Sequence, residues 1–441
     1  MLKLEQKLEK QEIIKLYTKG FKKREHFQIG IEYERLPISL SSGKTVDYWT
    51  EYGIKNLLEK YSKEETWDYI LDNKNIIGLQ KVHDTITLEP GSQVEISTKP
   101  EKTIFHLKEK INSINNTLKP ITDNLNITLL NYGVSPLSTY KSINIIPKNR
   151  YRIMARYLWG ILSDVMMRET AGIQCCIDFS SEEDAMRKFK LANKLSPFIC
   201  AMFANSPIRG GVDTGYKSFR ALSWLNTDND RCGFAGKISE EFSFEDYIDC
   251  VMKTPMIFIQ RNDLQFEING DITFDEYIKN GYNGAEATIE DYELQANLYF
   301  PEVRMRNFIE IRNHDCVGGD LKYAILAIYK GIMYNESAMK ECEELLKHLQ
   351  YNDFSEIRYN VPKYALDTPV KKLKISDYAK EIINIAEKSL KEMQTGEDIF
   401  IDSIKEYTFN NITPADVILK NWYGSWNKDL SKMVKYLSEK I

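Results

Sequence analysis

The chain has 441 residues, of which 43% are hydrophobic and 28% charged, an ordinary composition for a globular protein. Its net charge of −5 gives no electrostatic reason to expect nucleic acid or an anionic membrane as a partner. Residues 1–20 are charged throughout and the apolar stretches are short, so we expect neither a signal peptide nor a membrane span.

The spacing of apolar residues predicts strands and helices in alternation along the first half of the chain. Residues 3–23 predict an amphipathic helix and residues 28–36 a strand. Further elements are expected as a helix at 48–61, strands within 66–98, a helix at 102–125 interrupted by Pro120, a strand at 127–134 and helices at 149–168 and 181–204.

The second half becomes mostly helical after residue 318. A polar segment at 216–235 precedes expected elements at 254–261 (strand), 291–300 (helix), 308–313 (strand), and 319–334, 336–349, 376–393 and 427–440 (helices). No repeat or linker marks a boundary. We therefore expect one α+β domain over 1–441, with a leading helix (1–25), a core (26–318) and a helical flank (319–441).

Residues 86–97 predict two short strands joined by a turn at Pro90-Gly91. Side chains alternate between the faces of a strand, so Glu89, Gln93 and Glu95 should lie opposite the apolar residues of this hairpin. Neither strand carries Lys or Arg among these residues. The pattern indicates a cation site more than a solvated surface.

The same alternation recurs in three other strands. It places on one polar side Glu32 and Glu34 (from IGIEYER), Gln174, Cys176 and Asp178 (from IQCCIDF), and Glu310 and Arg312 (from FIEIR). Carboxylates gathered on one sheet need cations or arginines between them. Oxygen ligands without Cys/His clusters favour Mg²⁺ or Mn²⁺. The structural alternatives are a solvated surface for the glutamates, a core aromatic for Trp224 and small buried hydrophobes for Cys175 and Cys176.

Several other chemistries lack their sequence signals. The chain has no GxxxxGK[ST] and no GxGxxG after a strand, so a nucleotide would be bound without either loop. Seven cysteines without CxxC spacing predict neither a disulfide framework nor a zinc site, and we expect a cytoplasmic protein. Among the five histidines only His314, which follows a polar-faced strand, is a candidate for the site.

Seven ordered segments together resemble the plant-type glutamate–cysteine ligases, which belong to the glutamine-synthetase-like carboxylate–amine ligases. The segments are IGIEYER, ITLEPGSQVEIS, IQCCIDFSSEEDAMRKF, FANSP, SFRALSWLNTDNDRCGF, TPMIFIQRN and FPEVRMRNFIEIR, covering roughly 29–319. The resemblance implies a curved, mainly antiparallel sheet with a polar concave face and helices on its convex side.

The resemblance also implies a reaction. In this family ATP phosphorylates the γ-carboxylate of glutamate, and the amine of cysteine then attacks to give γ-glutamylcysteine, the first step of glutathione synthesis. The implied cofactors are ATP and Mg²⁺, with Mn²⁺ possible, and the partners are small-molecule substrates. We expect a monomer or homodimer.

The resemblance assigns roles to individual residues. The implied metal ligands are Glu32, Glu34, Glu95 and Glu310, with Glu89 in the catalytic group and Gln93 near the nucleotide. Arg220 and Arg261 would hold carboxylates of glutamate, and Arg312 would face the transferred phosphate. Arg304 and Arg231 would add positive charge around the transferred phosphate. Trp224, Gln174 and Cys176 would form walls of the substrate pocket.

The chain departs from the family pattern at Glu169, Gly172 and Cys176, where family members commonly have Arg, Thr and Asn. This departure leaves two alternatives open. One is a sister ligase that activates glutamate or another carboxylate for a different amine. The other is a catalytically silent homologue that binds a partner or senses a metabolite.

Overall fold

The computed structural model describes residues 8–238, 240–262 and 264–438. In these ranges the chain is an α+β fold built on a nine-stranded sheet. The strand order is β14 (Val303–Met305), β15 (Ile309–Asp315), β7 (Gly172–Ile177), β1 (Ile29–Ser39), β5 (Val94–Ser97), β4 (Asp84–Leu88), β3 (Asn75–Lys81) and β2 (Asp68–Asp72), and β6 (Ile127–Leu130) also pairs with β1. The strands pair antiparallel, so the predicted fold class is confirmed.

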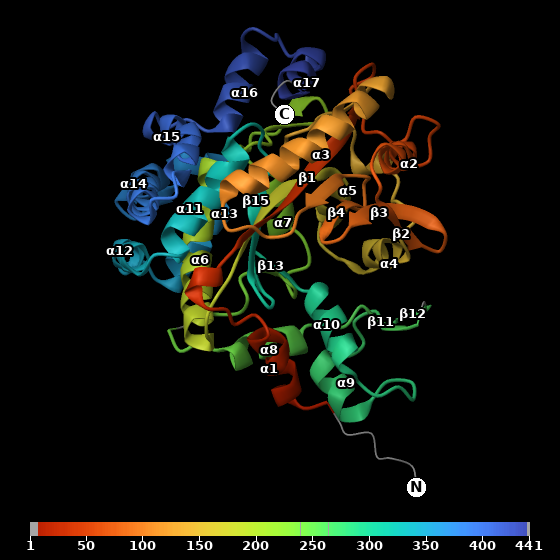
Figure 1. Ribbon diagram of the computed structural model, residues 1–441, viewed down its shortest axis with the longest axis vertical. Coiled ribbons are helices and arrows are strands. Elements are labelled where there is room, and N and C mark those ends of the chain that lie inside the picture. The colour runs from red at the N-terminus through yellow and green to blue at the C-terminus, as the bar shows by residue number, and fades with distance from the viewer. Residues whose placement is uncertain (1–7, 239, 263, 439–441) are drawn as a thin grey trace.

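Helices cover one face of the sheet. Ile29, Ile31 and Tyr33 of β1 point to this side and share a hydrophobic core with α3 (Ile104–Asn124), α6 (Glu182–Met202) and α11 (Leu321–Met333). Figure 1 shows α3 lying alongside β1 on this side of the sheet. Burial of these apolar faces supplies the main stabilisation of the layer.

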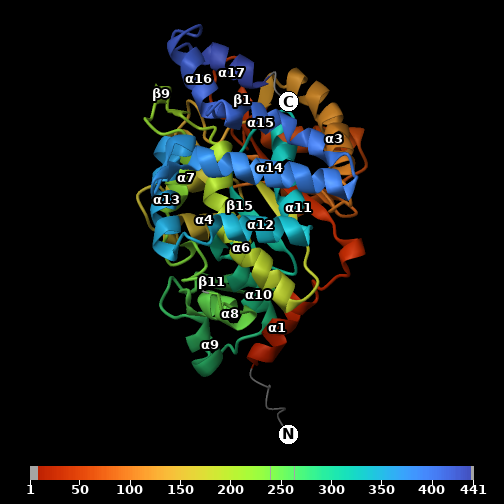
Figure 2. The ribbon, with the colours of Figure 1, turned by 90° about the vertical axis from the view of Figure 1, so that its left-hand side faces the viewer.

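A second layer of helices lies outside the first. α14 (Ile375–Met393) packs on α11, and α12 (Glu336–Leu346) contacts both, as Figure 2 shows. The remaining helices of this flank are α13 (Tyr351–Tyr364), α15 (Asp402–Phe409), α16 (Pro414–Tyr423) and α17 (Leu430–Ser438). The part of the flank that the structure describes is therefore mainly helical.

The opposite face of the sheet is covered by α4 (Asn149–Tyr157), α5 (Ser163–Glu169) and α7 (Phe219–Leu225). α1 (Lys10–Thr18), α8 (Phe244–Lys253), α9 (Phe274–Asn280) and α10 (Ile289–Asn297) form a separate group below the sheet in Figure 1. A second core lies between the β3–β5 strands, α2 (Ile54–Glu64) and the end of α3. Four short pairs of strands lie outside the main sheet in the described ranges. They are β8 (Ile208–Arg209) with β9 (Val212–Asp213), β10 (Cys232–Gly233) with β13 (Phe300–Pro301), β11 (Phe258–Arg261) with β12 (Leu264–Glu267), and β16 (Pro369–Val370) with β17 (Leu373–Lys374).

Several predicted boundaries were wrong, including the start of the helix expected at 48–61, since α2 begins at Ile54. The leading helix occupies only Lys10–Thr18, and residues 3–7 of its predicted range lie outside the described residues. Pro120 does not interrupt α3, because it lies on the exposed side of the helix, where water can satisfy the freed carbonyl. The helix predicted at 149–168 is divided into α4 and α5 around Gly160, whose φ of 114° is not helical.

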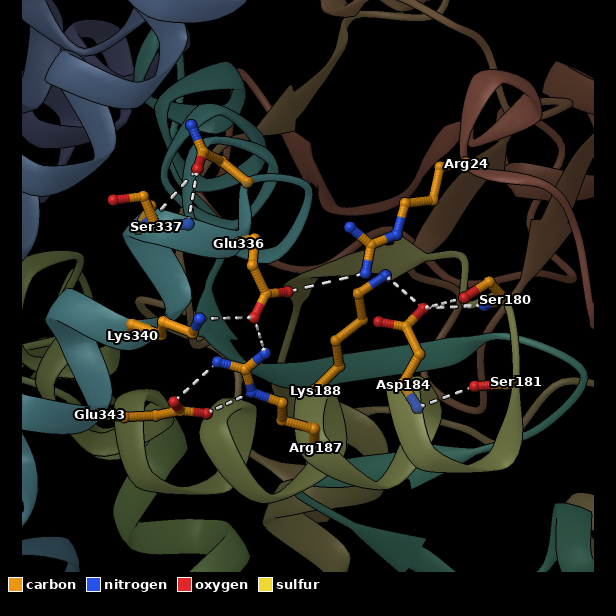
Figure 3. Close-up of polar contacts among 12 residues, drawn as sticks. Arg24, Ser180, Ser181, Asp184, Arg187, Lys188, Glu336, Ser337, Lys340 and Glu343 are labelled. Carbon is orange, nitrogen blue, oxygen red and sulfur yellow. Dashed lines mark hydrogen bonds and ion pairs between the residues drawn. The ribbon is translucent and has the colours of Figure 1, made fainter.

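Polar contacts fix the long helix α6 against α12, as Figure 3 shows. Ser181 caps α6 by accepting a hydrogen bond from the Asp184 N–H (3.2 Å). Arg187 forms ion pairs with Glu336 and Glu343 of α12. None of the helices in the described ranges is long and apolar enough to cross a membrane.

Candidate active site

Adjacent strands gather the predicted carboxylates on the face of the sheet opposite α3, α6 and α11. The register of β15, β7, β1 and β5 pairs Glu310 with Cys176, Gln174 with Glu32, and Glu34 with Glu95. The hairpin prediction is confirmed, because β4 and β5 pair antiparallel and bury their apolar side chains. His314 points to the helical side instead, where its ring bonds the Tyr329 hydroxyl (3.1 Å) and is fully buried.

A cavity of about 320 Å³ opens on the polar face. The predicted residues that line it are Glu32, Glu34, Glu89, Gln93, Glu95, Gln174, Arg220, Trp224, Arg304 and Arg312. The carboxylates come from β1, β5 and the hairpin turn and form its floor. Most of the arginines come from β14, β15 and α7 and form its wall.

The floor carboxylates are partly buried and repel one another. Burial and the neighbouring Glu310 carboxylate raise the pKa of Glu32 to about 7. Burial also raises the pKa of Glu34, with Glu89 adding to the effect. Burial and the other three floor carboxylates raise the pKa of Glu95 well above its usual range. Without a cation, these raised pKa values favour the protonated form of the floor carboxylates. A bound cation would favour the ionised form and displace the protons.

Glu310 is fully buried and is surrounded by guanidinium groups. Arg304 donates to both of its oxygens (2.7 and 3.0 Å), Arg312 donates to one (2.8 Å), and Arg306 lies at 3.6 Å. Burial alone would raise the pKa of Glu310, but these three arginines hold it well below its usual range. The structure thus gives Glu310 arginine partners in place of the free oxygens of a metal ligand, and its direct role here is to position those arginines.

Strand alternation orients Arg312. It lies two residues after Glu310 in β15 and therefore on the same polar face, next to Gln174, whereas the register shift that follows, between Ile311 and His314, pairs His314 with Ile173. Arg312 Nη1 donates to Gln174 Oε1 (2.8 Å), and Gln174 Nε2 donates to Glu34 Oε1 (3.1 Å). One hydrogen-bonded chain therefore links the arginine wall to the carboxylate floor.

Arg220 is positioned by the start of α7. Ser218 caps this helix by accepting from the Ala221 N–H (3.0 Å) and donates its hydroxyl to Asp315 (2.8 Å). Ser206 donates to the other oxygen of Asp315 (2.6 Å). The end of β15 thereby anchors the first turn of α7, and with it the backbone of Arg220.

The Arg220 guanidinium lies at the cavity with spare hydrogen-bonding capacity. It is 3% exposed, and Nη2 donates to the Arg312 carbonyl (3.0 Å). Nε and Nη1 are buried without a hydrogen-bond partner among the described residues. A Cβ at Gly172 would lie 2.3 Å from Nη2, so glycine at this position leaves the space that the guanidinium occupies.

Sequence reasoning missed the wall that α4 contributes. Tyr151 donates its hydroxyl to Glu89 (3.0 Å), and Lys148 lies 4.4 Å above the Tyr151 ring. Arg150 donates to the Asn297 carbonyl (2.9 Å), while its buried Nε lacks a partner in the described chain. The dense basic run KNRYR was the available signal for this wall.

Comparison with protein families adds to this geometry. The family model described as Glutamate-cysteine ligase family 2 matches residues 28–420. The chain belongs to this family. The match includes the whole nine-stranded sheet and every residue that lines the 320 Å³ cavity.

Relatives in the glutamate–cysteine ligase family match over most of their length. The chain is 31% identical to the chloroplastic glutamate–cysteine ligase of Medicago truncatula over 431 residues, 96% of this chain and 84% of the relative. It is 30% identical to the chloroplastic enzyme of Nicotiana tabacum over 438 residues, 98% and 83% of the two chains.

Two solved structures share the fold. A glutamate–cysteine ligase of Francisella tularensis in complex with AMP superposes with a TM-score of 0.60 at 15% identity, covering 95% of this chain and 89% of that one. A bifunctional glutathione synthetase of Pasteurella multocida gives 0.51 at 11% identity, covering 94% and 52%.

Four residues predicted for the ligase site, Glu310 and the three described next, do not line the cavity. Arg231 is buried and donates to Asp228 (2.7 Å) and to backbone carbonyls. Arg261 of β11 makes a two-bond ion pair with Asp291 (2.6 and 2.8 Å). Cys176 is buried in β7 beside Glu310. The structure does not bring these three to the cavity, because their polar groups already have partners or are covered, and the nucleotide and substrate roles predicted for them remain predictions.

Gln93 and Trp224 line the cavity but differ in the hydrogen-bond donors that they leave available to a ligand. Gln93 accepts from the Gly91 N–H (2.7 Å) and donates to the carbonyls of Met167 and Thr170, so it fastens the hairpin turn to α5. The Trp224 indole N–H is buried without a partner among the described residues. Of the two, only Trp224 has a donor left for a ligand.

The ligase family implies a divalent metal, and the floor carboxylates are the candidate ligands for it. Within the described ranges, no group of three His, Cys, Asp or Glu residues is already arranged to hold a metal ion. The floor offers only oxygen donors, and their raised pKa values reflect uncompensated charge. Both features fit a hard divalent cation, which Glu32, Glu34 and Glu95 would hold.

Proposed function

We propose that the chain joins glutamate to the amine of cysteine at the expense of ATP and forms γ-glutamylcysteine, the first step of glutathione synthesis. The observation that carries this proposal is a single cavity with a carboxylate floor and an arginine wall. Polyphosphate with divalent cations fits the floor, and a dicarboxylic amino acid fits the wall. Family membership and the names of the relatives support the same reaction.

Arg220 is the proposed anchor for glutamate. Its buried Nε and Nη1 groups have no partner in the described chain, and the guanidinium lines the cavity. A planar guanidinium binds a carboxylate through two parallel hydrogen bonds, so a substrate carboxylate would satisfy it. This contact would fix the orientation of glutamate relative to Arg312.

Arg312 and Arg304 are proposed to face the transferred phosphoryl group. In the first step the γ-phosphoryl group passes from ATP to a γ-carboxylate oxygen of glutamate, and ADP leaves. In the second, the amine attacks the acyl carbon, and phosphate and a proton leave. Bound Mg²⁺ would neutralise phosphate charge, and the arginines add fixed positive charge preorganised by Glu310.

No protein nucleophile is required by this scheme. Cys176, which pairs with Glu310 in the sheet, is buried, and burial raises the pKa of its thiol well above the usual range. The cavity therefore works by positioning and charge neutralisation, as phosphoryl transfer generally requires.

The acceptor amine is proposed to lie on the Trp224 side of the cavity. Trp224, Phe300 and Arg312 line both this cavity and a smaller adjoining space. The free indole N–H could donate to the acceptor, which supports a small amino acid there. The rival, a sister ligase with another amine, rests on the departures at Gly172 and Cys176, both in β7.

The test is ADP formation with ATP, Mg²⁺ and glutamate, with and without cysteine, and with the product identified by mass. Cysteine-dependent ADP release with γ-glutamylcysteine formed supports the proposal. Glutamate-dependent release that another amine stimulates better supports the sister ligase, and no ADP under any condition supports a silent homologue. Arg220→Met should raise the KM for glutamate, whereas the matched variant Arg261→Met should leave it unchanged.

Location and assembly are also proposals. All seven cysteines carry free thiols, which fits a reducing compartment, and we propose the cytosol. The relatives are named as chloroplastic, so cell fractionation with a plastid marker is the test. We propose a monomer or homodimer, which light scattering on the purified chain distinguishes.

A further inference from the structure

A second cavity, mainly apolar in its lining but with several polar side chains, lies on the helical side of the sheet. Its volume is about 280 Å³, and its walls come from β1, β6, α3 and the end of α17. The lining includes Arg35, Asn115, Lys119, Asp123 and Thr128. Arg35 follows Glu34 in β1, and because side chains alternate, it points away from the catalytic face.

Arg35 is a buried cation without a counterion. Its side chain is 2% exposed, and Nε and Nη2 have no hydrogen-bond partner among the described residues. Its guanidinium carbon lies over the ring of Tyr33, 4.9 Å from the ring centroid. A buried charge without a partner is strongly destabilising, so an arginine in this position requires an anion or ordered water.

The surroundings add positive charge to the same region. Lys322 is 3% exposed, lies 5.3 Å from the centroid of the Tyr33 ring and donates to the Gly319 carbonyl (2.8 Å). Burial, with Arg35 as the next cause, lowers the pKa of Lys322 to about 8. Asp123, the carboxylate in the cavity lining, bonds Lys119 (2.6 Å) and not Arg35.

Asn115 supplies a second unsatisfied polar group. It is 9% exposed, and its side-chain oxygen is buried without a partner in the described chain. Unpartnered polar atoms therefore come from both β1 and α3, on two walls of one cavity. Asn115 Oδ1 accepts and the Arg35 guanidinium donates, so a ligand that carries both an anionic oxygen and an O–H, such as hydrogen phosphate, would satisfy both.

We propose that this cavity binds a small anion bearing a carboxylate or phosphate group, held by the Arg35 guanidinium. The guanidinium matches either group through paired hydrogen bonds. The cavity volume admits a single phosphate ion or a small organic acid. This site is independent of the ligase reaction, since Arg35 and the floor glutamates occupy opposite faces of β1.

The first test uses inorganic phosphate as the probe at constant ionic strength. Because phosphate also fits the catalytic cavity, the comparison is made between Arg312→Met and the double variant Arg312→Met/Arg35→Met. We expect phosphate to raise the Tm of the single variant by about 2–5 °C and to leave the double variant unchanged. An equal shift in the two variants would overturn the proposal.

The second test needs no substitution at Arg35 and decides the matter if the double variant does not fold. Crystals of the unmodified chain are soaked in sodium selenate, and selenium is located by anomalous scattering. A peak beside Arg35 is expected. Selenium sites elsewhere without one in this cavity would overturn the proposal.

Discussion

A methyl group added at Gly172 tests how Arg220 is positioned. In the structure, a Cβ at this residue would lie 2.3 Å from Arg220 Nη2, 2.6 Å from Cζ and 2.9 Å from Nε. Ordinary contacts of this kind begin near 3.4 Å, so the guanidinium must move by about 1 Å in Gly172→Ala. The backbone of Gly172 need not move, because the atoms in its way belong to the end of a flexible side chain.

The expected loss follows from the bonds that Arg220 would no longer make with glutamate. A charged hydrogen bond contributes about 1.5–3 kcal/mol, which corresponds to about a 10- to 100-fold fall in kcat/KM for glutamate. A displacement of about 1 Å in a positioning group is sufficient for an effect of this size. The Tm should change by less than about 2 °C, since Gly172 is not in a left-handed conformation and the strand is retained.

The assay is initial-rate kinetics with glutamate varied at saturating ATP and cysteine, together with a thermal melt. Gly30→Ala is the matched control, because Gly30 lies on the same polar face in β1 and its Cβ would come closest to Cys176 Cβ, at 3.1 Å, with Pro100 at ordinary contact distances of 3.7 and 3.8 Å. We expect less than about a threefold change in that control. A folded Gly172→Ala chain with an unchanged KM for glutamate would refute the assignment of Arg220.

Three further predictions concern charge. Glu310→Gln should abolish turnover and keep the fold, because it removes the charge that holds three arginines; near-normal activity measured by ADP release would take Glu310 out of the mechanism. The raised pKa of Glu32, to about 7, means that its contribution to stability is complete below the unfolded value of about 4.5 and lost as pH rises through about 7. Melts in EDTA should therefore show a falling Tm over this range, and Mg²⁺ should restore it at pH 7–8; a flat profile in EDTA would contradict the carboxylate floor. Arg261→Met should lower the Tm by a few degrees through loss of the Asp291 pair while KM stays constant, and a raised KM would return Arg261 to the substrate site.

The polar face of the sheet could be predicted because its cause is local. Alternation along each strand places Glu32 with Glu34 and separates them from the buried Ile31 and Tyr33, whatever the rest of the chain does. The order of the four strands is not local, and it was not predicted; the resemblance to a known family implied only a mainly antiparallel sheet. The mostly helical nature of the flank followed from apolar periodicity, although α13, α15 and α16 were not predicted.

The errors among the arginines have a different cause. A sequence shows that an arginine is present but not which carboxylate will neutralise it after folding. Arg231 finds Asp228 three residues before it, and Arg261 finds Asp291 in another element, so both are satisfied inside the protein. Arg220 has no such carboxylate partner in the described ranges. The nearby Asp315 already accepts hydrogen bonds from two serine hydroxyls and a backbone N–H. Only the three-dimensional structure separates these cases.

The spatial order of the strands also has a consequence for biosynthesis. β15, β7, β1 and β5 are neighbours in the sheet but are synthesised in the order β1, β5, β7, β15. The part of the arginine wall at β14 and β15 is therefore the last part of the cavity to leave the ribosome, and until then the floor carboxylates lack the guanidinium groups of Arg304 and Arg312. Such non-local pairing slows folding. A nascent chain lacking β15 can expose the edge of β7, which is where we expect chaperones to be needed.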